Sequence, residues 1–281
     1  MADTPPLQAA PQEVRIPEVP SVREVLEDLA KTTVLKVQDY SKLSARSIRN
    51  LATGPRYMQD TVDQMDLIGV GSLPIVLLSG FFIGAVMVLQ TGAQFERFGQ
   101  ASLTGDIVSL ALVRELGPTI TGLLVAGRCS SGIASELGSM LVTEQVDAMR
   151  AMGTDPSRKL VTPRVLATLM TMPLLTTISV FIGLIGGMVA SVLSLRISAT
   201  TFWERAIKIL QFSDIMQGFS KTVVFAFILA TVGCYQGLNV RGGTQGVGRA
   251  TTQAVVVSSV LIIVSDTFLT RLCLWLADKF F

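Results

Sequence analysis

The chain has 281 residues, of which 49% are hydrophobic and only 16% are charged, whereas an ordinary soluble domain is about 25% charged. A net charge of +2, spread along the chain without a Lys/Arg run, excludes nucleic acid as a partner. The complete absence of histidine removes His-based proton relays, His metal ligands and Ser-His or Cys-His catalysis. The composition therefore predicts an integral membrane protein rather than a soluble enzyme.

The first sixty residues differ from the rest. Residues 1–20 hold prolines among small and acidic residues and lack the basic start and apolar core of a signal peptide, which predicts a disordered cytoplasmic tail. Residues 21–60 repeat apolar positions at helical intervals among mixed charges, which predicts amphipathic, interfacial helices. Such a helix could lie in the headgroup plane, which the basic cluster between residues 42 and 56 favours, or it could pack on a soluble partner.

Five later stretches are long and apolar enough to cross a bilayer, which needs about 20 residues of helix. These spans, at about residues 67–93, 107–141, 165–195, 222–240 and 250–276, form a transmembrane domain over 61–281. The polar segment 196–221 predicts a short interfacial helix between spans three and four. Eleven Lys and Arg lie near the span ends on the side of the membrane that holds the N-terminus, and seven lie on the opposite side. This difference favours a cytoplasmic N-terminus and a periplasmic C-terminus.

Span two carries four charges, Arg114, Glu115, Arg128 and Glu136. Each charge costs at least about 2.5 kcal/mol at the centre of a bilayer, so these side chains must be paired or must face water or protein. On a regular helix Arg114 and Arg128 lie within about 40° of each other. Two interpretations stay open: structural ion pairs with other spans, for example with Asp266 of span five, or a polar lining that forms a pathway or holds a resting state closed.

A short polar connector follows span two. Thr143 can cap a helix there, Glu144 and Asp147 favour its first turn, and Gly153 ends it. A short, well-terminated helix between two spans on the cytoplasmic side suits docking to a soluble protein, and the alternative is a helix lying flat on the membrane. The candidate docking residues are Glu144, Val146, Asp147, Met149 and Gly153.

Nucleotide, metal and disulfide motifs are missing from the chain. The glycine-rich stretch 241–252 does not have the GxGxxG spacing, and GxxxxGK[ST] occurs nowhere. The three cysteines share no CxxC spacing, which argues against a zinc site or a disulfide framework. We therefore expect no catalytic residues, no metal and no cofactor in this chain, and any use of ATP would belong to another subunit.

Four long motifs occur in order: ALVRELGPTITGLLVAGRCSSGIASELGSM, TEQVDAMRAMGTDPSRKLVTPR, RGGTQGVGRATTQAVVVSS and VSDTFLT. Together they resemble the MlaE/YrbE permease family, the membrane subunits of MCE-associated ABC lipid transporters, over residues 57–275. The resemblance implies an all-α fold with an N-terminal elbow helix, five transmembrane helices and a cytoplasmic coupling helix at 144–153. It also implies a homodimer in the bacterial inner membrane, a cytoplasmic ABC ATPase that binds ATP and Mg, a periplasmic MCE-domain protein expected to be hexameric, and a small STAS-type accessory protein.

The resemblance further implies a lipid cavity between the two copies that opens to the periplasm. Arg114 and Glu115 match the RELGP motif at the outer part of that cavity, and Met87, Gln94 and Phe95 at the end of span one would touch acyl chains. The leading hypothesis is therefore a permease that moves a phospholipid or related lipid between the inner membrane and an MCE partner, driven by a separate ATPase.

Two other classes of function stay in view. An ion- or proton-coupled secondary transporter or channel would use Glu115, Glu136 or Asp266 as its ion site, although the chain shows no inverted repeat. A non-transporting scaffold would leave the charges of span two without a purpose.

Overall fold

The computed structural model describes residues 22–53 and 57–280, and these residues form helices and connecting turns without a strand. Contacts divide the chain into two units, residues 1–39 and 40–281. The described part of the first unit is the beginning of α1 (Val22–Thr53), the predicted amphipathic helix. The predicted disordered tail, residues 1–20, lies outside the described residues.

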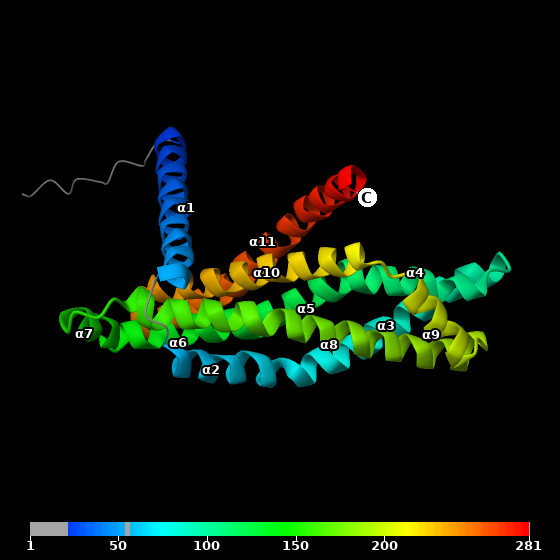
Figure 1. Cartoon of the computed structure of the whole chain (residues 1–281). Coiled ribbons are helices and arrows are strands. Elements are labelled where there is room, and N and C mark those ends of the chain that lie inside the picture. The colour runs from blue at the N-terminus through cyan, green and yellow to red at the C-terminus, as the bar shows by residue number, and fades with distance from the viewer. Residues whose placement is uncertain (1–21, 54–56, 281) are drawn as a thin grey trace, which may run out of the picture. The chain divides into compact units, whose positions relative to one another are not determined.

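The second unit holds the end of α1 and all later helices (Figure 1). They are α2 (Met58–Met65), α3 (Gly71–Arg97), α4 (Thr104–Ala111), α5 (Gly117–Val125), α6 (Ser131–Val142), α7 (Gln145–Ala151), α8 (Thr162–Leu195), α9 (Ala199–Lys208), α10 (Phe212–Leu238) and α11 (Gly243–Phe280). π-helical turns at Asp66–Val70, Leu112–Leu116 and Ala126–Ser130 join consecutive helices without a break. A fourth, Ser157–Val161, leads directly into α8, and a 3-10 turn, Ala101–Leu103, precedes α4.

Within the described residues, five continuous helical stretches are long and apolar enough to span a membrane, which confirms the predicted all-α membrane fold. They are Met58–Arg97, Ala101–Val142, Ser157–Leu195, Phe212–Leu238 and Gly243–Trp275.

Span four begins earlier than the predicted residue 222. The side chains of Gln211 and Asp214 form a capping box, in which Gln211 N–H donates to Asp214 Oδ2 at 2.9 Å, and this box starts α10 at Phe212. As a result, Asp214 and Lys221 belong to span four rather than to a polar interfacial segment.

Helices α7 and α9 lie at opposite ends of the bundle formed by the second unit (Figure 1). The two ends are named here after these helices. At the α9 end, the predicted short helix between spans three and four is present, and Ser198 caps it by accepting a hydrogen bond from Thr201 N–H at 3.1 Å. At the α7 end, a short helix joins spans two and three, as the sequence predicts.

Spans one and three approach each other closely along α3 and α8. A Cβ added at Gly84 would overlap the backbone carbonyl of Gly183, and one added at Gly186 would overlap the carbonyl of Phe81. Small residues permit such backbone approach between helices in lipid, where van der Waals packing drives association. These two spans therefore form a tightly packed pair.

Each span contributes at least one buried apolar residue to a shared cluster within the bundle. Val76, Val125, Met172, Phe225 and Ile262 come from spans one to five in order, and each is fully buried in one shared cluster. The middle of a single copy is therefore an apolar core rather than a polar pathway.

Candidate functional site

Two π-helical turns interrupt span two, and they carry three of its four predicted charges. At the first, Gly117 N–H donates to the carbonyl of Leu112, five residues back, and this turn holds Arg114 and Glu115. The second holds Arg128. A π turn takes up one extra residue and so rotates the following helix by about 100°, and such turns occur frequently at functional sites.

Arg114 reaches from the first π turn to α10. Its Nε donates to Asp214 Oδ1 at 2.8 Å, and its Nη2 lies 2.5 Å from the same oxygen. The Asp214 side chain is 1% exposed and the Arg114 side chain 38% exposed. The carboxylate is thus satisfied by the guanidinium and by the α10 cap, whereas the guanidinium keeps an open side.

Glu115 reaches from the first π turn to Lys221, a buried lysine of α10. The Lys221 ammonium is fully buried and donates to the Glu115 carboxylate and to the Thr270 hydroxyl at 2.7 Å. It also forms an ion pair with Asp266 Oδ1 at 2.9 Å, and in the described residues this oxygen accepts no hydrogen bond. Glu115 and Asp266 are thus joined through Lys221, which ties span two to spans four and five.

Together these ion pairs form one charge site, with three carboxylates and two cations. Its members are Arg114, Glu115, Asp214, Lys221 and Asp266. The sequence predicts the charges of span two and Asp266, but it misses Asp214 and Lys221, which lie in a polar stretch outside the predicted spans. The pair Gln211 and Asp214 was the signal that a helix starts before 222.

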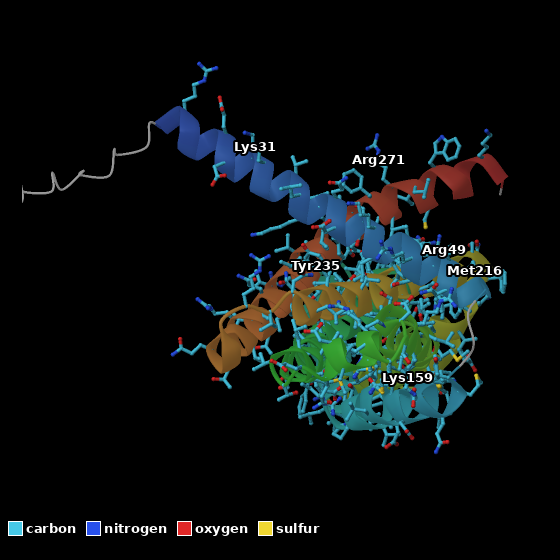
Figure 2. All side chains as sticks on the ribbon, turned by 90° about the vertical axis from the view of Figure 1, so that its left-hand side faces the viewer. Lys31, Arg49, Lys159, Met216, Tyr235 and Arg271 are labelled. Carbon is cyan, nitrogen blue, oxygen red and sulfur yellow. The ribbon has the colours of Figure 1, made fainter. Side chains whose placement is uncertain are left out.

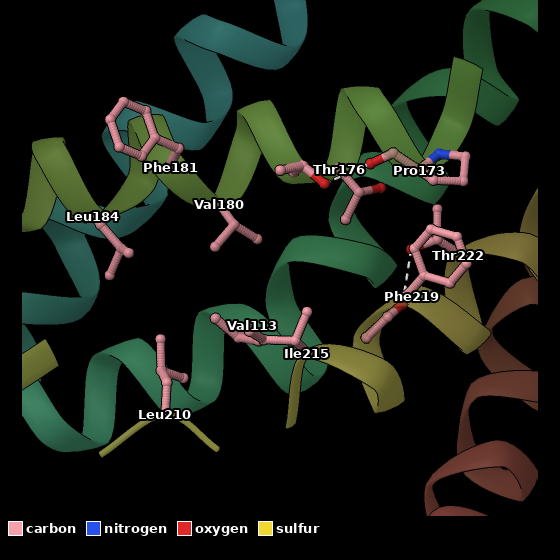
Figure 3. A pocket seen from close by; sticks show the side chains of 12 residues that line it. Val113, Pro173, Thr176, Val180, Phe181, Leu184, Leu210, Ile215, Phe219 and Thr222 are labelled. Carbon is pink, nitrogen blue, oxygen red and sulfur yellow. Dashed lines mark hydrogen bonds between the residues drawn. The ribbon is translucent and has the colours of Figure 1, made fainter. Parts of the chain in front are cut away.

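An apolar groove of about 250 Å³ begins beside the charge site, between α8, α10 and the first π turn (Figure 3). Val113 precedes Arg114 and Ile215 follows Asp214, and both line the groove. The remaining lining residues are Pro173, Thr176, Thr177, Val180, Phe181, Leu184, Leu210, Gly218, Phe219 and Thr222. An apolar groove beside a partly exposed guanidinium can hold an amphipathic molecule with an anionic group.

The other predicted lipid contacts lie on α3. Met87 is half-buried and packs on the cluster that contains Val88 and Phe202. Gln94 is exposed and Phe95 is half-buried. Arg114 and Glu115 contact α10, and Glu115 also contacts α11. In the described residues, no hydrogen bond or ion pair joins Met87, Gln94 or Phe95 to these charged side chains.

The prediction that Arg114 and Arg128 share a helix face is wrong. Arg128 turns to span one, where its Nη1 donates to the Leu67 carbonyl at 2.9 Å and to Ser72 Oγ at 3.2 Å. Leu67 lies in the π turn Asp66–Val70, where Gly71 N–H reaches back to Asp66 and leaves the Leu67 carbonyl open to Arg128. The π turns of span two change the rotation that a regular helix would give.

Glu136 makes an ion pair near the α7 end. Arg164 Nη2 donates to Glu136 Oε2 at 2.8 Å, and Arg164 Nη1 donates to the Leu160 carbonyl at 2.8 Å. The Arg164 side chain is 7% exposed and the Glu136 side chain 39% exposed, so this half-buried pair joins the end of span two to the start of span three.

Helix α7 is anchored by Val146, which is fully buried among residues that include Leu160 and Val161. Met149 packs partly on the same cluster. Because Val146 faces inward, it fixes the helix rather than presenting a contact surface. Its outward face includes Asp147, which pairs with Arg150 at 2.8 Å, and Glu144, directly before the helix, is also exposed.

The predicted cap of this helix is wrong in detail. Thr143 Oγ1 donates back to the Ser139 carbonyl at 2.8 Å and so belongs to the end of α6. The chain then turns at Glu144, which has a left-handed φ of 61°. The predicted stop is present, because Gly153 has a φ of 76°, which favours glycine.

Comparison with known proteins identifies the chain's relatives. The sequence model of the family described as Permease MlaE matches residues 61–272. The chain belongs to the MlaE permease family. A probable ABC transporter permease protein of Rickettsia felis is 42% identical over 236 residues, which cover 84% of this chain and 91% of the relative. The intermembrane phospholipid transport system permease protein MlaE of Haemophilus influenzae is 37% identical over 212 residues, 75% of this chain and 81% of the relative.

A third relative is from a plant. The chloroplastic protein TRIGALACTOSYLDIACYLGLYCEROL 1 of Arabidopsis thaliana is 35% identical over 228 residues, which cover 81% of this chain and 65% of the relative. This MlaE-family permease is a multi-pass membrane subunit of an ABC transporter, a class of subunit that works with an ATPase and other partners.

Proposed function

We propose that this permease is the membrane subunit of an ATP-driven lipid transporter. It moves a phospholipid or related lipid between the inner membrane and a periplasmic MCE-domain partner, with its N-terminus in the cytoplasm and its C-terminus in the periplasm. The observation that carries the proposal is the 37% identity to a phospholipid transport permease over 75% of this chain. That match supports a lipid as the substrate class.

The charge site supplies the chemistry for a lipid headgroup. The Arg114 guanidinium is 38% exposed, and it can donate to a phosphate while it keeps its bond to Asp214. The neighbouring groove supplies an apolar surface for part of an acyl chain. In the homodimer that we propose, a second copy completes the cavity, and Met87, Gln94 and Phe95 contact the acyl chains at the end of span one.

The α7 end supplies the site for the ATPase. The exposed acidic side chains of Glu144 and Asp147 form the docking face, and the buried Val146 transmits a push on α7 to the ends of spans two and three. ATP and Mg are bound by the ATPase and not by this chain. A small STAS-type protein completes the cytoplasmic part of the assembly.

Reconstitution tests the proposal directly. The permease is purified with its native partners, and mass spectrometry identifies the co-eluting proteins and the bound lipids. ATP-dependent transfer of labelled phospholipid between proteoliposomes and the MCE partner is then measured. The proposal fails if the complex contains no ATPase, or if ATP hydrolysis moves no lipid.

The ion-coupled alternative has less support. Its candidate carboxylates are held in ion pairs, Glu115 and Asp266 with Lys221 and Glu136 with Arg164. The middle of the bundle is an apolar core. A flux through liposomes of the isolated chain that follows an ion gradient without an ATPase would favour this alternative.

A further inference from the structure

The connector that follows α7 is tied to α2 by one side chain. Lys159 Nζ donates to the Asp60 carboxylate and lies 4.5 Å from the centre of the Tyr57 ring. Figure 2 views the second unit from the α7 end and labels Lys159, which lies beside span one. The Lys159 and Asp60 side chains are each 37% exposed, so the contact is half-buried.

An open pocket of about 360 Å³ lies beside this contact, between the end of α1, α2 and the start of α8. Its lining includes Asn50, Met58, Thr61, Leu166 and Met170. Next to the pocket, α2 and α8 are in contact. The Lys159 contact is therefore a polar link at the edge of the interface between α2 and α8.

Both ends of the link belong to elements with a part in the proposed mechanism. Lys159 lies in the π turn Ser157–Val161, whose Leu160 and Val161 share a buried cluster with Val146 of α7. On the other side, α2 continues through the π turn Asp66–Val70 into α3 without a break. Lys159 thus connects the buried cluster that holds α7 with the start of span one.

We propose that the contact of Lys159 with Asp60 and Tyr57 is the link that passes the movement of α7 to span one, which makes Lys159 a positioning residue for transport. This inference rests on the proposed function. A half-exposed ion pair changes an equilibrium by at most about five-fold. Such a weak link can break and re-form in each transport cycle, whereas the close α3–α8 contact cannot.

The test uses the complete complex with its ATPase and MCE partner. In the Lys159→Asp variant we expect wild-type co-purification of the ATPase and about five-fold less lipid moved per ATP hydrolysed. Exchanging the charges, with Asp60→Lys and Lys159→Asp together, restores the ratio, and Lys159→Arg keeps it. The matched control is Arg158→Asp, because Arg158 pairs 3.8 Å away with Asp155 of the same connector and not with α2.

A second measurement does not depend on the cargo. Spin labels at the exposed positions Gln59 on α2 and Met152 at the end of α7 report whether the two elements move together when the ATPase is trapped with nucleotide. We expect one narrow distance distribution in the otherwise unchanged protein and a broadened one in the Lys159→Asp variant. Equal coupling ratios for Lys159→Asp and Arg158→Asp, or no broadening, would overturn the link. Failure of the proposed function would instead appear as absent lipid transfer in the unmodified complex.

Discussion

Lys221 on α10 places its Nζ 2.9 Å from Oδ1 of Asp266 on α11, and no part of the Lys221 side chain is exposed. The same ammonium meets Glu115, so a single buried cation joins spans two, four and five. Removing charges from water costs several kcal/mol per ion, and only close pairing with complete hydrogen bonding offsets that cost. The association of these three spans therefore depends on each buried charge keeping its counter-charge.

Lys221→Met removes the cation and leaves Glu115 and Asp266 near each other without a counter-charge. We expect the free energy of unfolding to fall by about 3 kcal/mol, because breaking a buried pair leaves uncompensated charge. Thermal unfolding of the purified protein in detergent measures this. Adding Glu115→Gln and Asp266→Asn removes the repulsion and recovers most of the loss. A single variant as stable as the wild type would show that the charges do not hold the spans together.

Arg114→Lys keeps the positive charge but loses the planar guanidinium that bonds Asp214. Because Lys binds phosphate as a point charge rather than through a fork, we expect lipid transfer in proteoliposomes to fall about ten-fold with little loss of folded protein. The control is Arg128→Lys, the same exchange at an arginine that bonds span one instead. Equal losses in the two variants would remove the special role of Arg114.

Gly84→Ala adds a methyl group where the Gly183 carbonyl lies. Overpacking of this kind costs about 1–3 kcal/mol, so we expect a clear fall in unfolding temperature as α3 and α8 separate. Gly127→Ala is the matched control, because no atom lies within 4 Å of its added Cβ. The control variant is expected to be neutral or slightly more stable, since Ala has a higher helix propensity.

Glu144→Arg combined with Asp147→Arg reverses the charge of the exposed face of α7. We expect the ATPase to stop co-purifying, while membrane insertion and unfolding temperature stay unchanged because both side chains are exposed. The same double reversal at the exposed Glu96 and Glu204, distant from α7, serves as control and should leave the complex intact. Retention of the ATPase by the first variant would place the docking surface elsewhere.

The five spans could be predicted because the length of an apolar stretch is a property of the sequence alone. The turn at Gly153 was also predictable, since a left-handed φ favours glycine. The partners of the charges were not. Asp214 and Lys221 look like residues of a polar loop, and only the paired structure shows that Arg114 and Glu115 make them compatible with a membrane span.

Hydropathy also carries no information on π turns. Arg114 and Arg128 would share a face on a regular helix. Each of the two π turns in span two takes up one extra residue, so the regular spacing does not apply. The same limit applies to Val146, whose apolar character suits either a docking surface or an anchor. Because the Val146 side chain is fully buried, it acts as an anchor for α7.

The π turn Leu112–Leu116 makes the local winding of span two as important as its composition. If this turn became regular helix with no change in residue number, the part of span two before it would rotate against the part after it by about 100°. Arg114 would then no longer face Asp214, although every charged residue would still be present. Loss of the turn should therefore be far more harmful than a conservative substitution of Val113.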